Sequence, residues 1–223
     1  MEKIEKYIPK IESRLRHIYI NVPKEIYRCS GINVLNKRIK SLLFTTDLAI
    51  IRNANADSIM AVYPFTPQNT INQSIINVAS MPCFVGVGGG TTSGDRSVNI
   101  AFQAELIGAY GVVVNAPIKD DVITKIANLI DIPVLATISS FKDDYKSKFE
   151  AGAKILNVSA AKDTPKLVKQ IRKEMGPEIP IIATGGKEVS SIEETIDAGA
   201  NAITYTPPSS AEVFKEMMKK YRK

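Results

Sequence analysis

The sequence predicts an α/β protein folded as one (β/α)8 TIM barrel with an N-terminal helical extension. Three observations support this prediction. Strand-like and helix-like segments alternate along the chain, they recur about every 47 residues, and the nucleotide-binding turn of the competing open sheet is missing. With 223 residues and 44% hydrophobic content, the chain is long enough for one such domain.

The repeat is marked by two kinds of strand entry. A proline is tolerated at the first residue of a strand, and a glycine in the left-handed conformation closes a preceding helix. The prolines are Pro82, Pro133 and Pro180, and the glycines are Gly108, Gly152 and Gly199. Each period therefore holds two strand–helix units, and four periods make a closed barrel.

The expected strands follow from these entries. They cover residues 41–46, 58–63, 83–88, 111–115, 134–139, 154–159, 181–185 and 202–206, with helical patterns such as 164–175 and 189–198 between them. Residues 41–223 are the predicted barrel. Residues 1–40 are expected to form a helix and an irregular segment that pack on it and close its bottom. A doubly wound sheet would need GxGxxG after its first strand, where this chain has Thr45-Thr46-Asp47.

Composition narrows the class of protein. The net charge of +6 comes from residues 1–40, with ten Lys/Arg against four Asp/Glu, while the remaining residues hold nineteen of each. Without aromatic interleaving, this extension is interpreted as a solvated helix face, and we expect no nucleic-acid partner. Apolar runs are too short to cross a membrane. Cys29 and Cys83 are far apart and predicted to be reduced, buried thiols of a cytoplasmic protein; a homo-oligomer is left open.

Every predicted strand ends in a polar residue or in glycine. Active sites of this fold lie at the C-terminal ends of the strands, so the pattern predicts a binding cavity there. The residues are Asp47, Tyr63, the 88–94 loop, Asn115, Ser139, Asn157 with Ser159, Thr184 and Thr204 with Thr206. The alternative is that they merely cap the layers of the barrel.

Two turns are predicted to hold an anion. After the seventh strand, Thr184-Gly185-Gly186-Lys187 leads into a helix, whose N-terminal N–H groups attract negative charge. After the eighth, Thr206 is followed by Ser209 and Ser210, either of which would cap the last helix. A third turn, with Gly89, Gly90 and Thr91, is interpreted as a second anion cradle, a lid or a plain connector.

Candidates for chemistry are few. The single histidine, His17, lies in the extension, so we predict no metal site and no histidine base in the cavity. Asp47 is the best acid/base candidate, although it would equally cap a helix from Leu48. Asn115 and Asn157 would orient the ligand, and Lys162 would hold an anion. A Schiff base at Lys162 is discounted, because lysines with that role generally lie within the barrel wall. Ser159 with Lys162 is an alternative serine–lysine hydrolase pair.

The run Ile182-Ala183-Thr184-Gly185-Gly186, with Gly199-Ala200 following, resembles the aldolase-type and ribulose-phosphate-binding barrels. The resemblance covers the last quarter of the chain and implies that Gly185 and Gly186 hold phosphate. The chain departs at Thr206-Pro207-Pro208, where those families have glycine. Flavin-binding members share the strand-seven signature, but the glycine-threonine that they usually have after strand eight is missing here. No cofactor is therefore predicted, and FMN stays open. The order of strand ends is also similar to uncharacterised barrels loosely labelled hydrolases.

These observations lead to one hypothesis and two alternatives. The leading one is an enzyme for a small anionic, phosphorylated metabolite, working by lyase- or isomerase-type proton transfer or carbon–carbon bond chemistry. The alternatives are a hydrolase of uncharacterised specificity and a regulatory barrel that binds a phosphorylated ligand without turnover.

Overall fold

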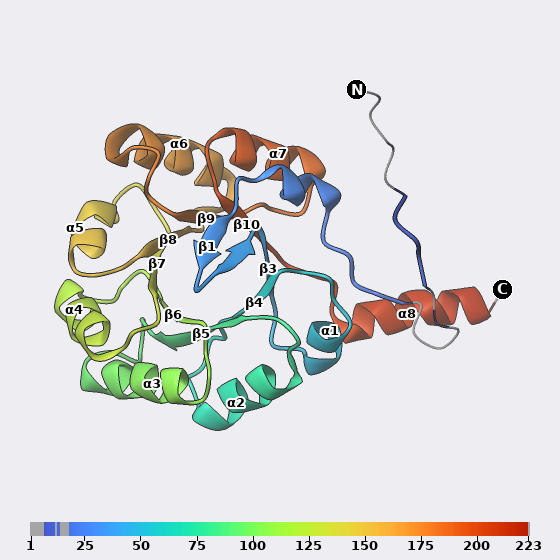
Figure 1. Ribbon diagram of the computed structural model, residues 1–223, viewed down its shortest axis with the longest axis horizontal. Coiled ribbons are helices and arrows are strands. Elements are labelled where there is room, and N and C mark those ends of the chain that lie inside the picture. Colours follow the sequence, from blue (N-terminus) through green and yellow to red (C-terminus); the bar gives the residue numbers. More distant parts are fainter. Residues whose placement is uncertain (1–6, 12, 14–17, 223) are drawn as a thin grey trace.

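The computed structural model describes residues 7–11, 13 and 18–222, and His17 lies outside them. Parallel strands close into a barrel in the order β10-β3-β4-β5-β6-β7-β8-β9, with helices outside it (Figure 1). The strands are β3 (Ser41–Phe44), β4 (Ser58–Ala61), β5 (Cys83–Gly88), β6 (Gly111–Val114), β7 (Val134–Ile138), β8 (Ile155–Val158), β9 (Ile181–Thr184) and β10 (Ala202–Tyr205). All eight predicted strands are confirmed.

Helices follow the strands in the expected alternation. They are α1 (Leu48–Arg52), α2 (Asn69–Val78), α3 (Asp95–Leu106), α4 (Asp120–Leu129), α5 (Tyr145–Glu150), α6 (Thr164–Met175), α7 (Val189–Asp197) and α8 (Ser210–Tyr221), with a 3-10 turn, η2 (Ala161–Asp163), before α6. In the described part of the chain, no helix combines the length and apolar character needed to cross a membrane.

Side chains in the barrel interior form layers. The lower layer is apolar and consists of Leu42, Met60, Phe84, Val113, Leu135, Ile155, Ile182 and Ala202. Because side chains alternate along a strand, the residues two positions further on face the same interior. That upper layer is Phe44, Val62, Gly86, Asn115, Thr137, Asn157, Thr184 and Thr204. The interior therefore changes from apolar to polar toward the C-terminal ends of the strands.

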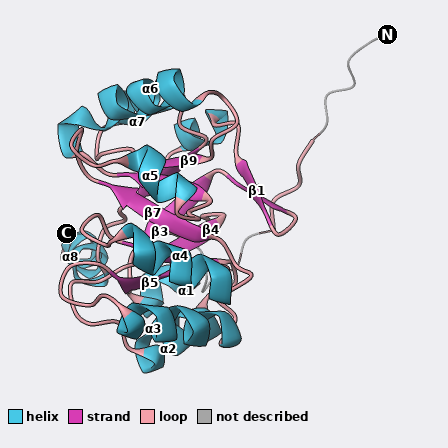
Figure 2. Cartoon of the chain, turned by 90° about the vertical axis from the view of Figure 1, so that its left-hand side faces the viewer, coloured by secondary structure: helices cyan, strands magenta, loops and turns pink. Residues whose placement is uncertain are grey.

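A hairpin closes the bottom of the barrel. Strands β1 (Ile32–Val34) and β2 (Lys37–Ile39) are antiparallel, and their buried Ile32, Val34 and Ile39 pack on the apolar lower layer. Figure 2 shows the hairpin projecting from one face of the barrel. The hairpin lies where the sequence predicts a plug. Part of residues 1–40, where a helix was predicted, lies outside the described residues; in the part that is described no α-helix is found, and alternating apolar residues around a left-handed Asn36 favour the hairpin.

The segment from Ile20 to Cys29 covers the outside of the barrel between α7 and the loop after α1. Ile20 pairs with Ala54, and the 3-10 helix η1 (Lys24–Arg28) lies beside α7, where Arg28 contacts Glu193 (2.9 Å) and Asp197 (3.2 Å). Val22, Ile26 and Cys29 are buried there. The position between the seventh and first helices is therefore filled by this segment.

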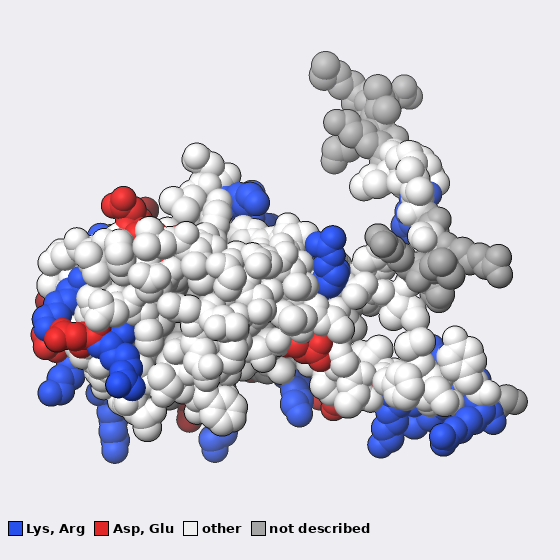
Figure 3. All heavy atoms as spheres, turned by 90° about the horizontal axis from the view of Figure 1, so that it is seen from below, with Lys and Arg blue, Asp and Glu red and all other residues white. Residues whose placement is uncertain are grey.

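Helix α8 projects away from the barrel as a consequence (Figure 1). None of its residues is buried, and Phe214 and Tyr221 are 65% and 77% exposed. Figure 3 shows Lys and Arg side chains gathered along this projecting part. A groove of about 320 Å³ runs between α8 and α1, lined by Ile20, Ile50 and Val213 among others.

Candidate active site at the mouth of the barrel

A cluster of polar side chains, which we call the polar ring, lies at the C-terminal mouth of the barrel. It consists of Thr137, Asn157, Thr184 and Thr204, one from each strand from β7 to β10, and of Asn115, which directly follows β6. Asn157 and Thr204 are only 7% and 4% exposed. Parallel strand pairing holds Thr137 beside Asn157 and Thr184 beside Thr204.

Two oxygens of the polar ring are buried without a protein partner in the described structure. Asn157 donates from Nδ2 to Oγ1 of Thr137 at 3.2 Å, but its Oδ1 accepts no hydrogen bond, and Oγ1 of Thr204 has none either. A buried polar atom left unpaired costs about 1–3 kcal/mol. Such atoms in a concave site indicate a place where ligand or water completes the hydrogen bonding.

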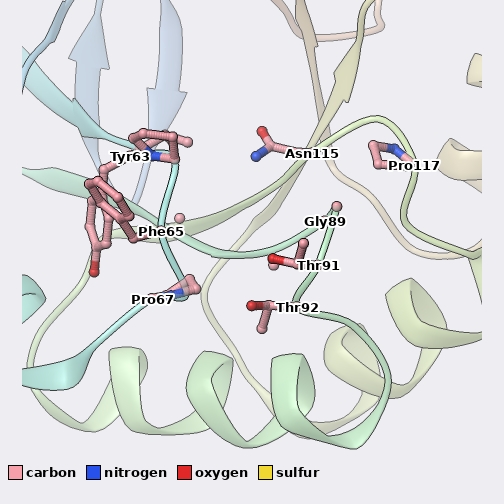
Figure 4. Close-up of a pocket in the computed structure, with 13 residues that line it drawn as sticks. Tyr63, Phe65, Pro67, Gly89, Thr91, Thr92, Asn115 and Pro117 are labelled. Carbon is pink, nitrogen blue, oxygen red and sulfur yellow. The ribbon is translucent and has the colours of Figure 1, made fainter.

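A cavity of about 380 Å³ opens beside the polar ring, at the ends of β4, β5 and β6. Figure 4 shows Tyr63, Phe65 and Pro67 on one side, with Gly89, Thr91, Thr92 and Asn115 on the other. Its lining is completed by Val62, Pro64, Gly86, Gly88, Gly90 and Pro117. Asn115 belongs to both the ring and the cavity, so the two are parts of one site.

The loop after β5 can approach Asn115 only because residue 89 of the loop is glycine. At Gly89 the backbone has a φ of +107°, and an added Cβ would lie 2.5 Å from Cβ of Asn115. At Gly88 an added Cβ would lie 2.0 Å from Oγ of Ser97. The loop is held there by the amide of Gly89, which donates to the carbonyl of Thr92 at 2.7 Å. The structure thus brings the predicted residues Gly89, Gly90 and Thr91 together with Asn115.

Hydrogen bonds to its hydroxyl hold Tyr63, one of the aromatic residues that line the cavity. The hydroxyl of Tyr63 accepts from the amide of Gln68 at 2.9 Å and donates to Oδ1 of Asn72 at 3.2 Å. Asn72 is fully buried in α2, and its Nδ2 has no partner among the described residues. Sequence reasoning missed Asn72 and Phe65, since neither ends a strand.

Thr137 was also missed, because Ser139 was taken as the end of its strand. Ser139 instead lies in the loop after β7, where its amide and hydroxyl donate to Oδ2 of Asp143 at 2.6 and 2.9 Å. The alternation of β7 places Thr137 inward with Leu135. Applying that alternation to the sequence would have found it.

Asp47 caps helix α1. Its Oδ1 accepts from the amides of Ala49 (3.0 Å) and Ile50 (3.2 Å), and its Oδ2 accepts from the amide of Ser210 (3.2 Å). Partial burial opposes the charged form, but the hydrogen bonds from Ser210, Ile50 and Ala49 outweigh it and lower the pKa of Asp47. The geometry therefore gives this carboxylate the capping role that the sequence left open, and its acid/base role stays a prediction.

At the predicted anion site after β9 and β10, the amides of Gly185, Ser209 and Ser210 donate hydrogen bonds within the chain. The amide of Gly185 donates to the carbonyl of Thr204 at 3.2 Å. At the start of α8, Ser209 and Glu212 form a capping box, and the Ser210 amide donates to Asp47. Asp47 and Glu212 thus supply carboxylates to the N-terminus of α8, where N–H groups attract negative charge.

The remaining predicted residues lie outside the cavity. Lys162 in η2, Gly186, Lys187 and Thr206 are exposed and do not line it. Oγ of Ser159 accepts from Oγ1 of Thr184 at 3.1 Å, and no contact in the described structure joins Ser159 to Lys162. The described structure therefore gives no support to a serine–lysine hydrolase pair.

Comparison with known proteins gives the fold. No protein-family model and no curated protein matches the chain. Among solved structures, a phosphonopyruvate hydrolase in complex with oxalate and Mg2+ matches with a TM-score of 0.65 and 12% identity over 83% of this chain and 82% of that chain. A 2,3-dimethylmalate lyase of the PEP mutase/isocitrate lyase superfamily matches with 0.64 and 12% over 88% and 83%. A phosphoenolpyruvate phosphomutase from Streptomyces platensis subsp. rosaceus matches with 0.62 and 12% over 82% and 80%.

The Mg2+ of one neighbour raises the question of whether this site fits a metal. Among the described residues, no three His, Cys, Asp or Glu side chains come together to hold an ion. The mouth offers amide and hydroxyl groups, while Asp47 and Asp143 are committed to a helix cap and a loop. Hard cations such as Mg2+ are usually held by carboxylates, so this donor set does not fit one, and we derive no step through a metal.

Proposed function

We propose that the chain is a barrel enzyme for a small anionic metabolite, bound at the mouth through the polar ring and the adjoining cavity. Oδ1 of Asn157 and Oγ1 of Thr204 carry the proposal, because both are buried and unpartnered among the described residues. Oδ1 only accepts, whereas the threonine hydroxyl both donates and accepts. A ligand with a hydroxyl or enol next to a carboxylate or phosphate oxygen satisfies both.

The fold and its neighbours support this class of substrate. Neighbouring structures are named as a phosphonopyruvate hydrolase, a phosphoenolpyruvate phosphomutase and a dimethylmalate lyase, and their named substrates are small anions. Neutral donors preorganised in a dry cavity can stabilise an oxyanion. Lyase- or isomerase-type chemistry at an enolate is the reaction class that we favour; carboxylate and phosphate remain the two candidate anions.

Titration of the intact protein tests this proposal. Pyruvate, oxalate and inorganic phosphate are added separately, and binding is followed by calorimetry and amide chemical shifts. Thr204→Val removes one hydroxyl at constant shape and is expected to weaken binding at least about tenfold. The control is Asn99→Ala, at an exposed position of α3, which should bind like the wild type. Binding that is absent for all three probes, or unchanged in Thr204→Val, would contradict the proposal.

We also propose that the protein forms a homo-oligomer through α8. The helix leaves its own barrel because residues 20–29 fill its place, and its apolar face borders an apolar groove on the same chain. In a two-fold dimer the same helix and groove of both copies would face each other, which is the arrangement that we propose.

The cytoplasm is the compartment that we favour, since the two cysteines are buried and free.

A further inference from the structure

The cavity at the mouth differs chemically from the polar ring beside it. Thirteen residues line the cavity, and none of them is Asp, Glu, Lys, Arg or His. The polar ring has no charged side chain either, but it holds two buried oxygens without a partner, on Asn157 and Thr204, whereas no described residue that lines the cavity has such an atom. We therefore assign the anionic group of the proposed substrate to the polar ring and the cavity to a different part of the same molecule.

The walls of the cavity show what that part is. On one side are the rings of Tyr63, Phe65 and Pro67, and on the other is the glycine backbone of the β5–α3 loop (Figure 4). Aromatic side chains bury large apolar areas and favour stacked or edge-on contacts with another ring. Phe65 is 71% exposed in the free protein, so a bound group would cover apolar surface that now faces water.

The cavity is nevertheless not purely apolar. Asn115 reaches in from the end of β6, and Thr91 and Thr92 border it from the loop (Figure 4). Oγ1 of Thr92 is engaged with Oγ1 of Thr66 at 3.2 Å, which ties the two walls together. Asn115 also lines the polar ring, so a group in the cavity and an anion in the ring would meet at its amide.

From these observations we infer that the substrate carries, next to its anionic group, an uncharged ring-bearing side group that binds between Tyr63, Phe65 and the Gly88–Gly90 backbone. This inference rests on the proposed function, since it assumes that the anion binds at the polar ring. It adds a specificity subsite formed by the loops after β4 and β5. A volume of about 380 Å³ holds one ring with a short linker.

The test compares two acids that share one head group. Pyruvate has only the head group, whereas phenylpyruvate adds a phenyl ring, and calorimetry measures the Kd of each for the intact protein. We expect phenylpyruvate to bind at least about tenfold more tightly, because the ring buries apolar area against Phe65.

Two variants locate the effect. Gly86→Val fills the cavity, and position 86 accepts a side chain because its φ is not positive and an added Cβ would lie 3.4 Å from the Val62 side chain. Phe65→Ser removes one wall at an exposed loop position, so it keeps the test valid if Gly86→Val folds poorly. In both variants we expect the preference for phenylpyruvate over pyruvate to disappear.

Each outcome separates the subsite from the proposed function. Equal wild-type affinities for the two acids would overturn the subsite and leave the anion site standing. A preference that survives in both variants would also overturn it. If neither acid nor inorganic phosphate binds, the proposed function fails and the subsite fails with it. Weaker binding of both acids by Thr204→Val, with the ratio of their two Kd values unchanged, would support the two-part site.

Discussion

Replacing Asp47 separates its observed capping role from its predicted role in proton transfer. Asp47→Ala removes the N-cap of α1, which typically costs about 1 kcal/mol, and the hydrogen bond to the Ser210 amide, which we set at about 1 kcal/mol because the site is only partly buried. The expected loss in the free energy of unfolding is about 2 kcal/mol. Asp47→Ser still caps α1 but does not reach Ser210, so about 1 kcal/mol is expected.

The pH dependence of the same difference provides a second measurement. The pKa of Asp47 is lower in the folded protein than the unfolded value of about 4. Its contribution to stability is therefore fully present above about pH 4 and is lost as the pH falls through the lower, folded pKa. The stability gap between wild type and Asp47→Ser should be constant from pH 7 to about pH 5 and should close below about pH 4.

Urea denaturation followed by circular dichroism gives these free energies, and the melting temperature of Asp47→Ala should fall by about 4–8 °C for a chain of this length. A loss below about 0.5 kcal/mol in Asp47→Ala would refute the capping argument. Asp47→Asn is the companion variant, since asparagine caps well but cannot exchange a proton at neutral pH. Full stability combined with abolished turnover in Asp47→Asn would restore the acid/base role.

Three further predictions concern other parts of the chain. Arg172 donates to four backbone carbonyls and to Oδ1 of Asn201, so Arg172→Met should lower the free energy of unfolding by about 3 kcal/mol, and a urea titration showing under 1 kcal/mol would contradict this. Burial raises the pKa of Cys29 to about 11 and of Cys83 to about 12; both thiols should resist a thiol reagent at pH 8 until guanidinium unfolds the protein, and rapid labelling of the native protein would count against their burial. Phe214→Asp on α8 should shift light-scattering mass toward the monomer, with the exposed Asn99→Ala as control; an unchanged mass, or a monomeric wild type, would disprove oligomerisation through α8.

Local sequence patterns determined the barrel strands. Seven predicted barrel strands begin at the same residue as in the structure. The remaining strand, predicted to begin at Lys154, begins one residue later, at Ile155. This agreement has a local cause, because proline and glycine set backbone angles at the position where they stand. Asn115, Asn157 and Thr184, which the sequence placed at strand ends, lie at the mouth, whereas Ser139 lies in the loop after β7.

Which polar residues form the site was decided only by the tertiary structure. Asp47 and Ser210 are 163 positions apart in sequence, and their contact engages the amide of Ser210, a residue that the sequence predicted to hold an anion. Residues 20–29 displace α8 because they reach the gap beside α7 in space, which no local pattern predicts. The cavity between Tyr63 and Gly89 likewise depends on loops from separate repeats. Strands follow from short-range backbone preferences, whereas a site depends on side chains that meet only after the barrel has closed.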